Sequence, residues 1–294
     1  MYYNTSGHST PLCFRGRAII DAVVDAVFRN VMGSTRLLKN AVNLVETGCS
    51  AGGLATYLHA DYVKALIPHS GAYYSLPISG YFLDYPSVFN GTYIYRQQIQ
   101  SIYKISNAST NAACQAHYTP TGDDWKCNMA EYVYPFISAN VFVLNSFVDR
   151  WQTGCILTAM PVTSPSQNGN CASAPGWEVC AVHPKNCTSD MIQHGYLPFS
   201  KYMTTSLQFV NAAKSTAPGN GGFLNSCFTH CEAQFGGFDT FKIGNTTMFS
   251  GVTQWMAANA NPSSPAPSSS FWSVDCFYTT TGSHVCNPTC WPTS

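Results

Sequence analysis

A serine at the centre of a Gly-x-Ser-x-Gly pentapeptide constrains this chain more than any other feature. The motif centres on Ser50 and includes Gly48 and Gly52. Residues 41–46 before it are mostly apolar and predict a short buried strand, and apolar side chains recur at helical spacing over residues 53–64. The sequence therefore predicts a sharp, strained strand-to-helix turn. We expect glycine on both sides of the serine because such a turn leaves no room for a β-carbon.

A turn of this kind exposes the serine hydroxyl and directs the first N–H groups of the next helix at a reacting oxygen. We therefore predict that Ser50 is a nucleophile and that the N–H of Ala51 is an oxyanion-hole donor. The alternative interpretation is a chance Gly-rich turn, because the pentapeptide alone is a weak signal. The strand before it and the helix after it favour the nucleophile.

Length and charge limit the fold and the partners. The 294 residues suffice for one large α/β domain or two small ones. Charged residues make up 10% of the chain, against about 25% in ordinary soluble domains. Lys+Arg and Asp+Glu balance at 14 each, so no field favours nucleic acid or an anionic membrane. No apolar run is long enough for a transmembrane helix. We expect a monomer with no nucleic-acid partner.

The cysteines predict an oxidising compartment. The chain has 13 of them, and five Asn-x-Ser/Thr sequons accompany them, at Asn4, Asn90, Asn107, Asn186 and Asn245. Their spacing suits local bridges for the pairs Cys114 with Cys127, Cys180 with Cys187, and Cys155 with Cys171.

Other cysteine pairings stay open at this point. Cys227 or Cys231 is expected to bridge to one of the C-terminal cysteines, which are Cys276, Cys286 and Cys290. Cys49 is predicted to be the odd thiol, packed under the turn. The alternative is a zinc site built from the two Cys-x3-Cys pairs with His230. The sequons and the cysteine count favour disulfides.

The first six residues are polar and do not form a signal peptide. A cysteine-rich composition without an export signal is a conflict. We expect that the natural N-terminus lies upstream of Met1 and that the chain is truncated.

Helices and strands are predicted to alternate, which is typical of a mostly parallel α/β sheet with flanking helices. The predicted helices cover residues 17–31, 53–64 and 192–213, and the predicted strands cover 41–46, 65–68, 141–145 and 223–225. We expect a single domain over residues 1–294. Within it we predict a cap-like insertion at 75–135, a disulfide-bearing loop at 161–189, and a linker with a Cys-rich tail at 259–294.

A serine nucleophile needs an imidazole to take its proton and a carboxylate to orient that imidazole. In α/β-hydrolases these partners follow in the order Ser, Asp or Glu, His, each just past a strand. Asp149 follows the predicted strand 141–145, and His230 follows 223–225. The alternatives are that Asp149 only caps a helix or pairs with Arg150, and that another histidine is the base.

Three blocks of sequence resemble the pectin acetylesterase/Notum family, on its pectin acetylesterase side. They are GCSAGGLA from residue 48, FVLNSFVDRWQ from residue 142 and GFLNSCFTHC from residue 222. The similarity runs from about residue 12 to the terminal cysteines. It implies a secreted ester hydrolase of α/β-hydrolase type that needs no metal or organic cofactor. In that family Ser50 would correspond to the nucleophile, Asp149 to the orienting acid and His230 to the base.

The resemblance also implies a substrate and a departure. The implied substrate is an O-acetylated polysaccharide such as pectin, and the alternatives are a lipid-modified protein, as on the Notum side, or a catalytically impaired remnant that only binds. Family members begin with strands that carry a Glu-Gly-Gly-Gly-Trp-type loop, which supplies a further oxyanion-hole donor. This chain starts after that loop. We therefore expect an α/β-hydrolase sheet that lacks its N-terminal strands, with 41–46 as an apolar edge.

Overall fold

A computed structural model describes residues 2–5, 8–11, 13–29, 41–67, 71–161, 171–213, 219–260, 271–273 and 287–290. The strands are β1 (Tyr2–Thr5), β2 (His8–Pro11), β3 (Asn43–Cys49), β4 (Ala72–Ile78), β5 (Asn140–Ser146), β6 (Gly221–Asn225), β7 (Lys242–Ile243), β8 (Thr246–Thr247) and β9 (Phe271–Ser273). The helices are α1 (Gly16–Arg29), α2 (Ala51–Leu66), α3 (Ile94–Ser106), α4 (Ala112–Tyr118), α5 (Ala130–Val133), α6 (Arg150–Gln152), α7 (Glu178–Val182), α8 (Ser189–Met191), α9 (Leu197–Ala213), α10 (Gly237–Thr240) and α11 (Met248–Ala260).

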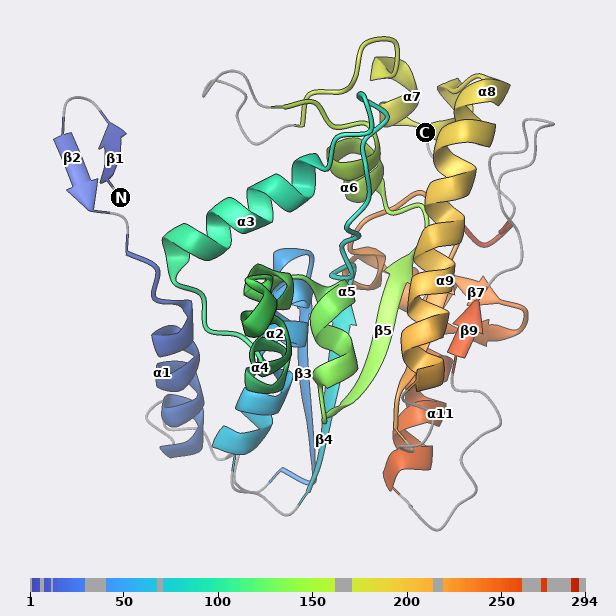
Figure 1. Cartoon of the computed structure of the whole chain (residues 1–294). Coiled ribbons are helices and arrows are strands. Elements are labelled where there is room, and N and C mark those ends of the chain that lie inside the picture. Colours follow the sequence, from blue (N-terminus) through green and yellow to red (C-terminus); the bar gives the residue numbers. More distant parts are fainter. Residues whose placement is uncertain are drawn as a thin grey trace.

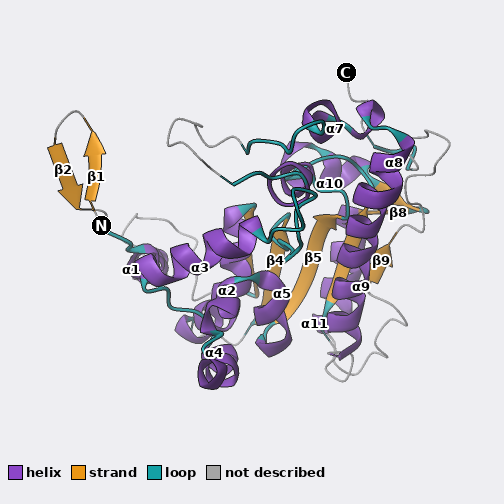
Figure 2. Ribbon diagram, turned by 45° about the horizontal axis from the view of Figure 1, so that its top comes forward, coloured by secondary structure: helices purple, strands orange, loops and turns teal. Residues whose placement is uncertain are grey.

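The central sheet has five strands in the order β3-β4-β5-β6-β9, and every pair is parallel. Parallel neighbours need a crossover connection, which most often contains a helix. The predicted parallel α/β architecture is therefore confirmed (Figure 1). The antiparallel hairpin β1–β2 lies apart from this sheet (Figure 2).

Helices cover both faces of the sheet. Strand β5 shows why, because alternate side chains point to opposite faces. Val141 and Val143 belong to a core cluster that includes residues of α2, α5 and α9. Phe142 and Leu144 belong to a second cluster that includes Met248, Val252 and Trp255 of α11. Helices α2, α5 and α9 cover the near face in Figure 1. The strand is buried on both sides, as its continuous apolar run predicts.

The predicted strand at 65–68 is wrong. Ala65 and Leu66 are the last residues of α2, and the next strand is β4, a few residues later. The apolar residues 65–66 extend the helix by half a turn, so their apolar character does not mark a strand. The predicted insertion at 75–135 accordingly begins inside β4, and α3, α4 and α5 follow.

Pro77 explains why β4 is hard to predict. Proline has no N–H to give to a sheet and is rare in central strands. The pairing of β4 with β5 joins Ser75 to Val141 and Ile78 to Leu144, with no pair between them. Pro77 lies in that interruption, so β4 occupies a central position despite its proline.

Apolar side chains are exposed at the β3 end of the molecule. Strand β3 is the first strand in the sheet order, and Val45 on it is 41% exposed. Helix α1 packs beside α2 (Figure 1) and leaves Ile19 and Val23 more than half exposed. The expected apolar edge is thus present. Of the helices described, none is both long and apolar enough to cross a membrane.

Five disulfides link the described residues. The three predicted local bridges are confirmed: Cys114–Cys127, Cys155–Cys171 and Cys180–Cys187. Cys227 pairs with the C-terminal Cys290. The fifth bridge joins Cys49 to Cys231. The prediction of a free Cys49 is therefore wrong, and the free cysteine among the described residues is Cys13. Cys276 and Cys286 lie outside the described residues.

Candidate active site

Ser50 occupies a strained turn between β3 and α2. Its backbone has φ 59° and ψ −122°. Residues other than glycine rarely adopt this combination of backbone angles. Its N–H donates to the carbonyl of Ile78 at 3.0 Å, and its carbonyl accepts from the N–H of Leu54 at 2.9 Å. These bonds to the neighbouring strand and to the first turn of the helix fix the strained conformation.

Close backbone contacts explain two glycines of this turn. A β-carbon on Gly48 would lie 2.5 Å from the carbonyl oxygen of Gly52, and one on Gly53 would lie 2.4 Å from the carbonyl oxygen of Ile78. A β-carbon on Gly52 would meet no atom within 4 Å. The expectation that the turn has no room for a β-carbon at residue 52 is therefore wrong. The tight contact on the helix side is made by Gly53, where α2 passes over β4.

Ala51 is the first residue of α2, which is 16 residues long. The first N–H groups of a helix have no acceptor within the helix, and the helix dipole adds partial positive charge there. The N–H of Ala51 therefore belongs to the set of backbone donors that can stabilise an anion beside Ser50.

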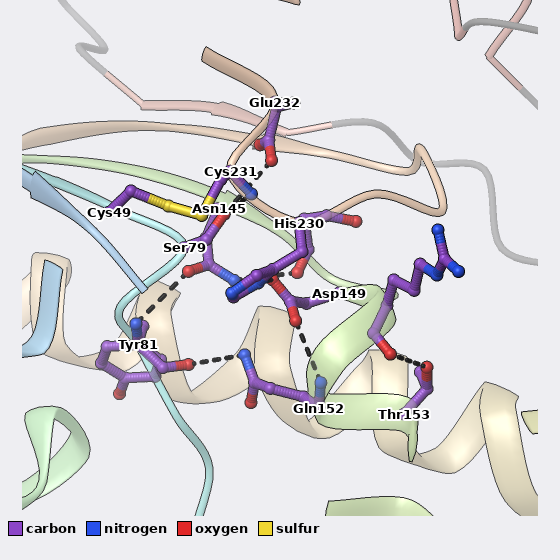
Figure 3. A network of polar contacts seen from close by, with 12 residues as sticks. Cys49, Ser79, Tyr81, Asn145, Asp149, Gln152, Thr153, His230, Cys231 and Glu232 are labelled. Atoms are coloured by element: carbon purple, nitrogen blue, oxygen red, sulfur yellow. Dashed lines mark hydrogen bonds and ion pairs between the residues drawn. A yellow bond between two sulfur atoms is a disulfide. The ribbon is translucent and has the colours of Figure 1, made fainter. Parts of the chain in front are cut away.

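Asp149 and His230 come together at the carboxyl ends of adjacent strands. Asp149 follows β5 and is fully buried, and His230 follows β6 with 19% of its side chain exposed. The Nδ1 atom of His230 lies 2.8 Å from Oδ2 of Asp149 (Figure 3). Oδ1 of Asp149 accepts the N–H of Gln152 at 3.0 Å. Asp149 thus caps α6, which is the alternative role predicted for it. The same carboxylate also binds His230.

The other ring nitrogen of His230 is free. Nε2 is buried and has no hydrogen-bond partner among the described residues. Burial lowers the pKa of His230, but the hydrogen bond and charge of Asp149, together with the charge of Glu232, raise it above its usual value overall. A neutral imidazole held at Nδ1 presents a lone pair at Nε2, so this atom can accept a proton from a hydroxyl.

Backbone and amide contacts hold the two loops together. The N–H of Arg150 donates to the carbonyl of Thr229 at 3.0 Å, which joins the loop of Asp149 to the loop of His230. The fully buried side chain of Gln152 donates to the carbonyl of Tyr81 at 3.0 Å and accepts the N–H of Leu83 at 3.1 Å. The loop after β4 is thereby fixed against the loop after β5.

A disulfide joins the serine turn to the histidine loop. It connects Cys49, the residue before Ser50, to Cys231, the residue after His230, with their Cα atoms 5.7 Å apart (Figure 3). The bridge therefore ties the turn of Ser50 to the loop of His230, while Nε2 of His230 makes no hydrogen bond to Ser50 in this structure. The sulfurs of both cysteines and a ring nitrogen of His230 lie within 4.8 Å of one another. Because the sulfurs are bonded to each other, neither is a thiolate that would hold zinc.

Glu232 is a fully buried acid beside this bridge. Its carboxylate accepts from Oγ of Ser79 at 3.2 Å and from Nδ2 of Asn225 at 3.0 Å. Oγ of Ser79 in turn accepts the N–H of Cys231 at 3.0 Å. Burial raises the pKa of Glu232, and the charge of Asp149 acts in the same direction. These contacts hold the histidine loop to the loop after β4.

Among the residues that the structure describes, His230 is the one histidine that forms an ion pair with a buried acid. His194 pairs with the exposed Asp190 one helical turn away, and His59 lies within α2 with its Nδ1 unpaired. The side chains of His8, His69 and His284 lie outside the described residues. Arg150 makes no ion pair with Asp149 among the described residues, which leaves the carboxylate of Asp149 to His230.

Several supporting residues do not stand out in the sequence. No sequence motif or spacing identifies Ser79, Glu232 or the partner of Cys49 as part of the site. Gln152 directly follows the Asp-Arg-Trp run, and Glu232 lies two residues after His230. Gln152 and Glu232 could have been identified only because they lie close in the sequence to Asp149 and His230.

A sequence profile described as pectinacetylesterase matches residues 3–290. The chain belongs to the pectinacetylesterase family. Two plant relatives are pectin acetylesterases 7 and 11 of Arabidopsis thaliana, which are 28% and 29% identical over 95% of this chain. Each alignment covers 63% of the relative. This pectinacetylesterase family member thus spans less than two thirds of the length of the curated relatives it matches.

Notum proteins are also related to this pectinacetylesterase family member. The palmitoleoyl-protein carboxylesterase Notum of Schmidtea mediterranea is 27% identical over 48% of this chain and 28% of its own length. The structure of the Wnt deacylase Notum from Drosophila superimposes with a TM-score of 0.68 at 17% identity, over 99% of this chain and 69% of that chain. The chain therefore has the α/β-hydrolase fold.

Proposed function

We propose that this chain is a serine carboxylic-ester hydrolase that removes O-acetyl groups from a pectin-type polysaccharide. One observation carries the proposal: Asp149 holds His230 with Nε2 free, on a loop that is disulfide-bonded to the residue before Ser50. Membership of the pectinacetylesterase family and the names of its plant relatives support the same activity.

In the proposed mechanism, Oγ of Ser50 attacks the acetyl carbonyl carbon while Nε2 of His230 takes the hydroxyl proton. The N–H of Ala51 donates to the oxyanion that forms. The intermediate collapses by breaking the bond to the sugar oxygen, and His230 gives the proton to this oxygen so that it leaves as a hydroxyl. An acetyl group stays on Ser50. Water then attacks this ester while Nε2 of His230 takes its proton, and His230 returns that proton to Oγ of Ser50 as acetic acid leaves. The side chain of Asp149 orients the ring of His230 and stabilises the imidazolium whenever it forms.

We propose that the enzyme acts as a monomer outside the cell or in the cell wall. Five disulfides suit an oxidising compartment. The sequon asparagines whose side chains are described are all exposed, as glycosylation requires: Asn90, Asn107, Asn186 and Asn245. The balance of 14 cationic and 14 anionic residues gives nucleic acid no reason to bind.

The test is acetate release from acetylated pectin by the purified chain. We expect release by the wild type, a loss of at least about 10³ in kcat with Ser50→Ala, and wild-type rates with Ser101→Ala. Ser101 is a suitable control because it is an exposed serine on α3 that bonds only to its own helix. No release by the wild type, or equal release by Ser50→Ala, would overturn the proposal.

A further inference from the structure

A cavity of about 480 Å³ opens beside His230. Arg150, Trp151 and Ser173 line it together with the disulfide Cys155–Cys171. Its volume lies in the range of about 300–1,000 Å³ that is common for small-molecule sites. Because His230 forms part of the wall, a group bound here lies next to the proposed base.

Arg150 contributes a cation with no ion-pair partner among the described residues. Its side chain is exposed, and no carboxylate of the described residues lies within 4.0 Å of its guanidinium. Arg96, by contrast, makes a bidentate pair with Asp84, in which Nε donates to Oδ1 and a terminal nitrogen donates to Oδ2. The backbone of Arg150 is nonetheless fixed, because its N–H bonds Thr229 and its carbonyl accepts from Oγ1 of Thr153 at 3.0 Å. The guanidinium therefore extends from a fixed point at the edge of the cavity.

Trp151 gives the cavity an aromatic wall. Its ring stacks on that of His230, with centroids 6.4 Å apart and an interplanar angle of 29°. Phe82 packs against Trp151 edge-on at 4.9 Å. An indole held in this way offers a rigid apolar surface to the C–H face of a sugar ring. The cavity thus combines an aromatic surface, a hydroxyl and an unpaired guanidinium.

We propose that Arg150 binds the carboxylate of a uronic acid residue next to the acetylated sugar, and that it sets the preference for an acidic polysaccharide over a neutral one. This inference depends on the proposed function. A guanidinium binds a carboxylate through two parallel hydrogen bonds, which fixes orientation as well as charge. The zero net charge of the chain does not oppose this preference, because recognition is local to one side chain.

The geometry favours a uronate over a fatty acyl tail. A tail needs an apolar pocket, and burying an uncompensated guanidinium against it is costly. A carboxylate instead supplies an ion-pair partner, which Arg150 does not find among the described residues. A neutral sugar can stack on Trp151, but it offers no carboxylate to the guanidinium of Arg150, which then stays hydrated.

The experiment compares kcat/KM on acetylated polygalacturonate with kcat/KM on the same polymer after full methyl esterification, which removes its charge. The variants are Arg150→Gln, Arg150→Lys and the control Lys104→Gln, which removes an exposed cation from α3. Hydrolysis of p-nitrophenyl acetate by the wild type tests the proposed function separately.

We expect the wild type to prefer the acidic polymer by about tenfold or more, since a charge-assisted pair is worth roughly this factor. Arg150→Gln should remove most of the preference, chiefly by raising KM on the acidic polymer. Arg150→Lys should keep part of it, and Lys104→Gln should keep all of it. The preference should also shrink at high salt.

Two results would overturn the inference: equal wild-type rates on both polymers, or a preference that survives in Arg150→Gln. Melting temperatures show that the variants are folded, and an exposed side chain should change them little. If the wild type hydrolyses p-nitrophenyl acetate but shows no polymer preference, the role of Arg150 fails while the proposed chemistry stands. If the wild type hydrolyses no ester, the proposed function fails as well.

Discussion

At the scale of single residues, the protonation of His230 controls the proposed reaction. Asp149 and Glu232 raise the pKa of His230 against the effect of burial, and only the neutral imidazole can take a proton from Ser50. Activity should therefore rise with pH through a pKa above the usual value of about 6.5 for histidine.

Replacing Asp149 with Asn should change both the rate and its pH dependence. The amide keeps the shape but removes the charge that raises the pKa of His230, so the acidic limb of kcat/KM should move to lower pH. The loss of tautomer control should lower kcat by about 10³–10⁴. A pH–rate profile on a small acetyl ester measures both effects. An acidic limb at the same pH in both enzymes would show that Asp149 does not act on His230.

Ser50 and His230 should behave as one unit. Ser50→Ala and His230→Ala are each expected to lower ester turnover by at least about 10³, and the double variant should be little worse than either single one. Steady-state kinetics on the three variants gives the comparison. A double variant that loses the product of the two single effects would refute joint action.

At the scale of elements, the site is built from loops at the carboxyl ends of neighbouring strands. The loop after β6 carries His230 and is tied to the end of β3 by Cys49–Cys231 and to the loop after β4 by Glu232. The loop after β5 carries Asp149. Cross-links between these loops, rather than any single element, set the geometry.

Removing the bridge Cys49–Cys231 should reduce catalysis more than its effect on stability accounts for. In the double variant Cys49→Ser/Cys231→Ser, the histidine loop loses its covalent link to the serine turn, and we expect kcat to fall by about tenfold or more. The matched control is Cys114→Ser/Cys127→Ser, which removes a buried bridge between α4 and the segment after it. A bridge is worth about 2–4 kcal/mol.

Circular dichroism melts and kcat, measured together, separate the two effects. The control should lower the melting temperature and keep kcat at temperatures where it is folded. Equal kcat values in the two double variants would contradict a positioning role for Cys49–Cys231.

The sequence predicts the parts of the site where chemistry follows directly after a strand. Asp149 and His230 both follow apolar runs that are strands in the structure, and a parallel sheet aligns such ends at one edge. The bridge from Cys49 lies beyond this reasoning, because its partner is 182 residues away and only the folded sheet brings the two together. β4 escapes prediction because Pro77 is atypical of a central strand.

At the scale of the whole molecule, buried acids make stability depend on pH. Burial raises the pKa of Glu46 to about 7, although a hydrogen bond from Tyr73 lowers this pKa in part. Burial also raises the pKa values of Glu131 and Glu232. A folded state that holds protons more tightly than the unfolded chain loses stability as pH rises through the folded pKa. His230 acts in the same direction, and His59, whose pKa is lowered, acts in the opposite one.

Replacing Glu46 with Gln isolates one part of this dependence. The free energy of unfolding of the wild type should fall between about pH 5 and pH 8. Glu46→Gln should be more stable than the wild type by about 3 kcal/mol at pH 8, and the difference should fall below about 1 kcal/mol at pH 5 and vanish near pH 4. Urea unfolding at a series of pH values measures this difference. A stability difference that does not change with pH would mean that folding does not raise the pKa of Glu46.

The most direct measurement of the central claim is covalent labelling with a fluorophosphonate, which reacts with a serine only when a neighbouring base activates it. Intact mass and peptide mapping of the labelled wild-type chain should show one label, on Ser50. Labelling should be absent in Ser50→Ala and far slower in His230→Ala. A wild-type chain that takes no label, or a Ser50→Ala chain that takes as much label as the wild type, would contradict the account.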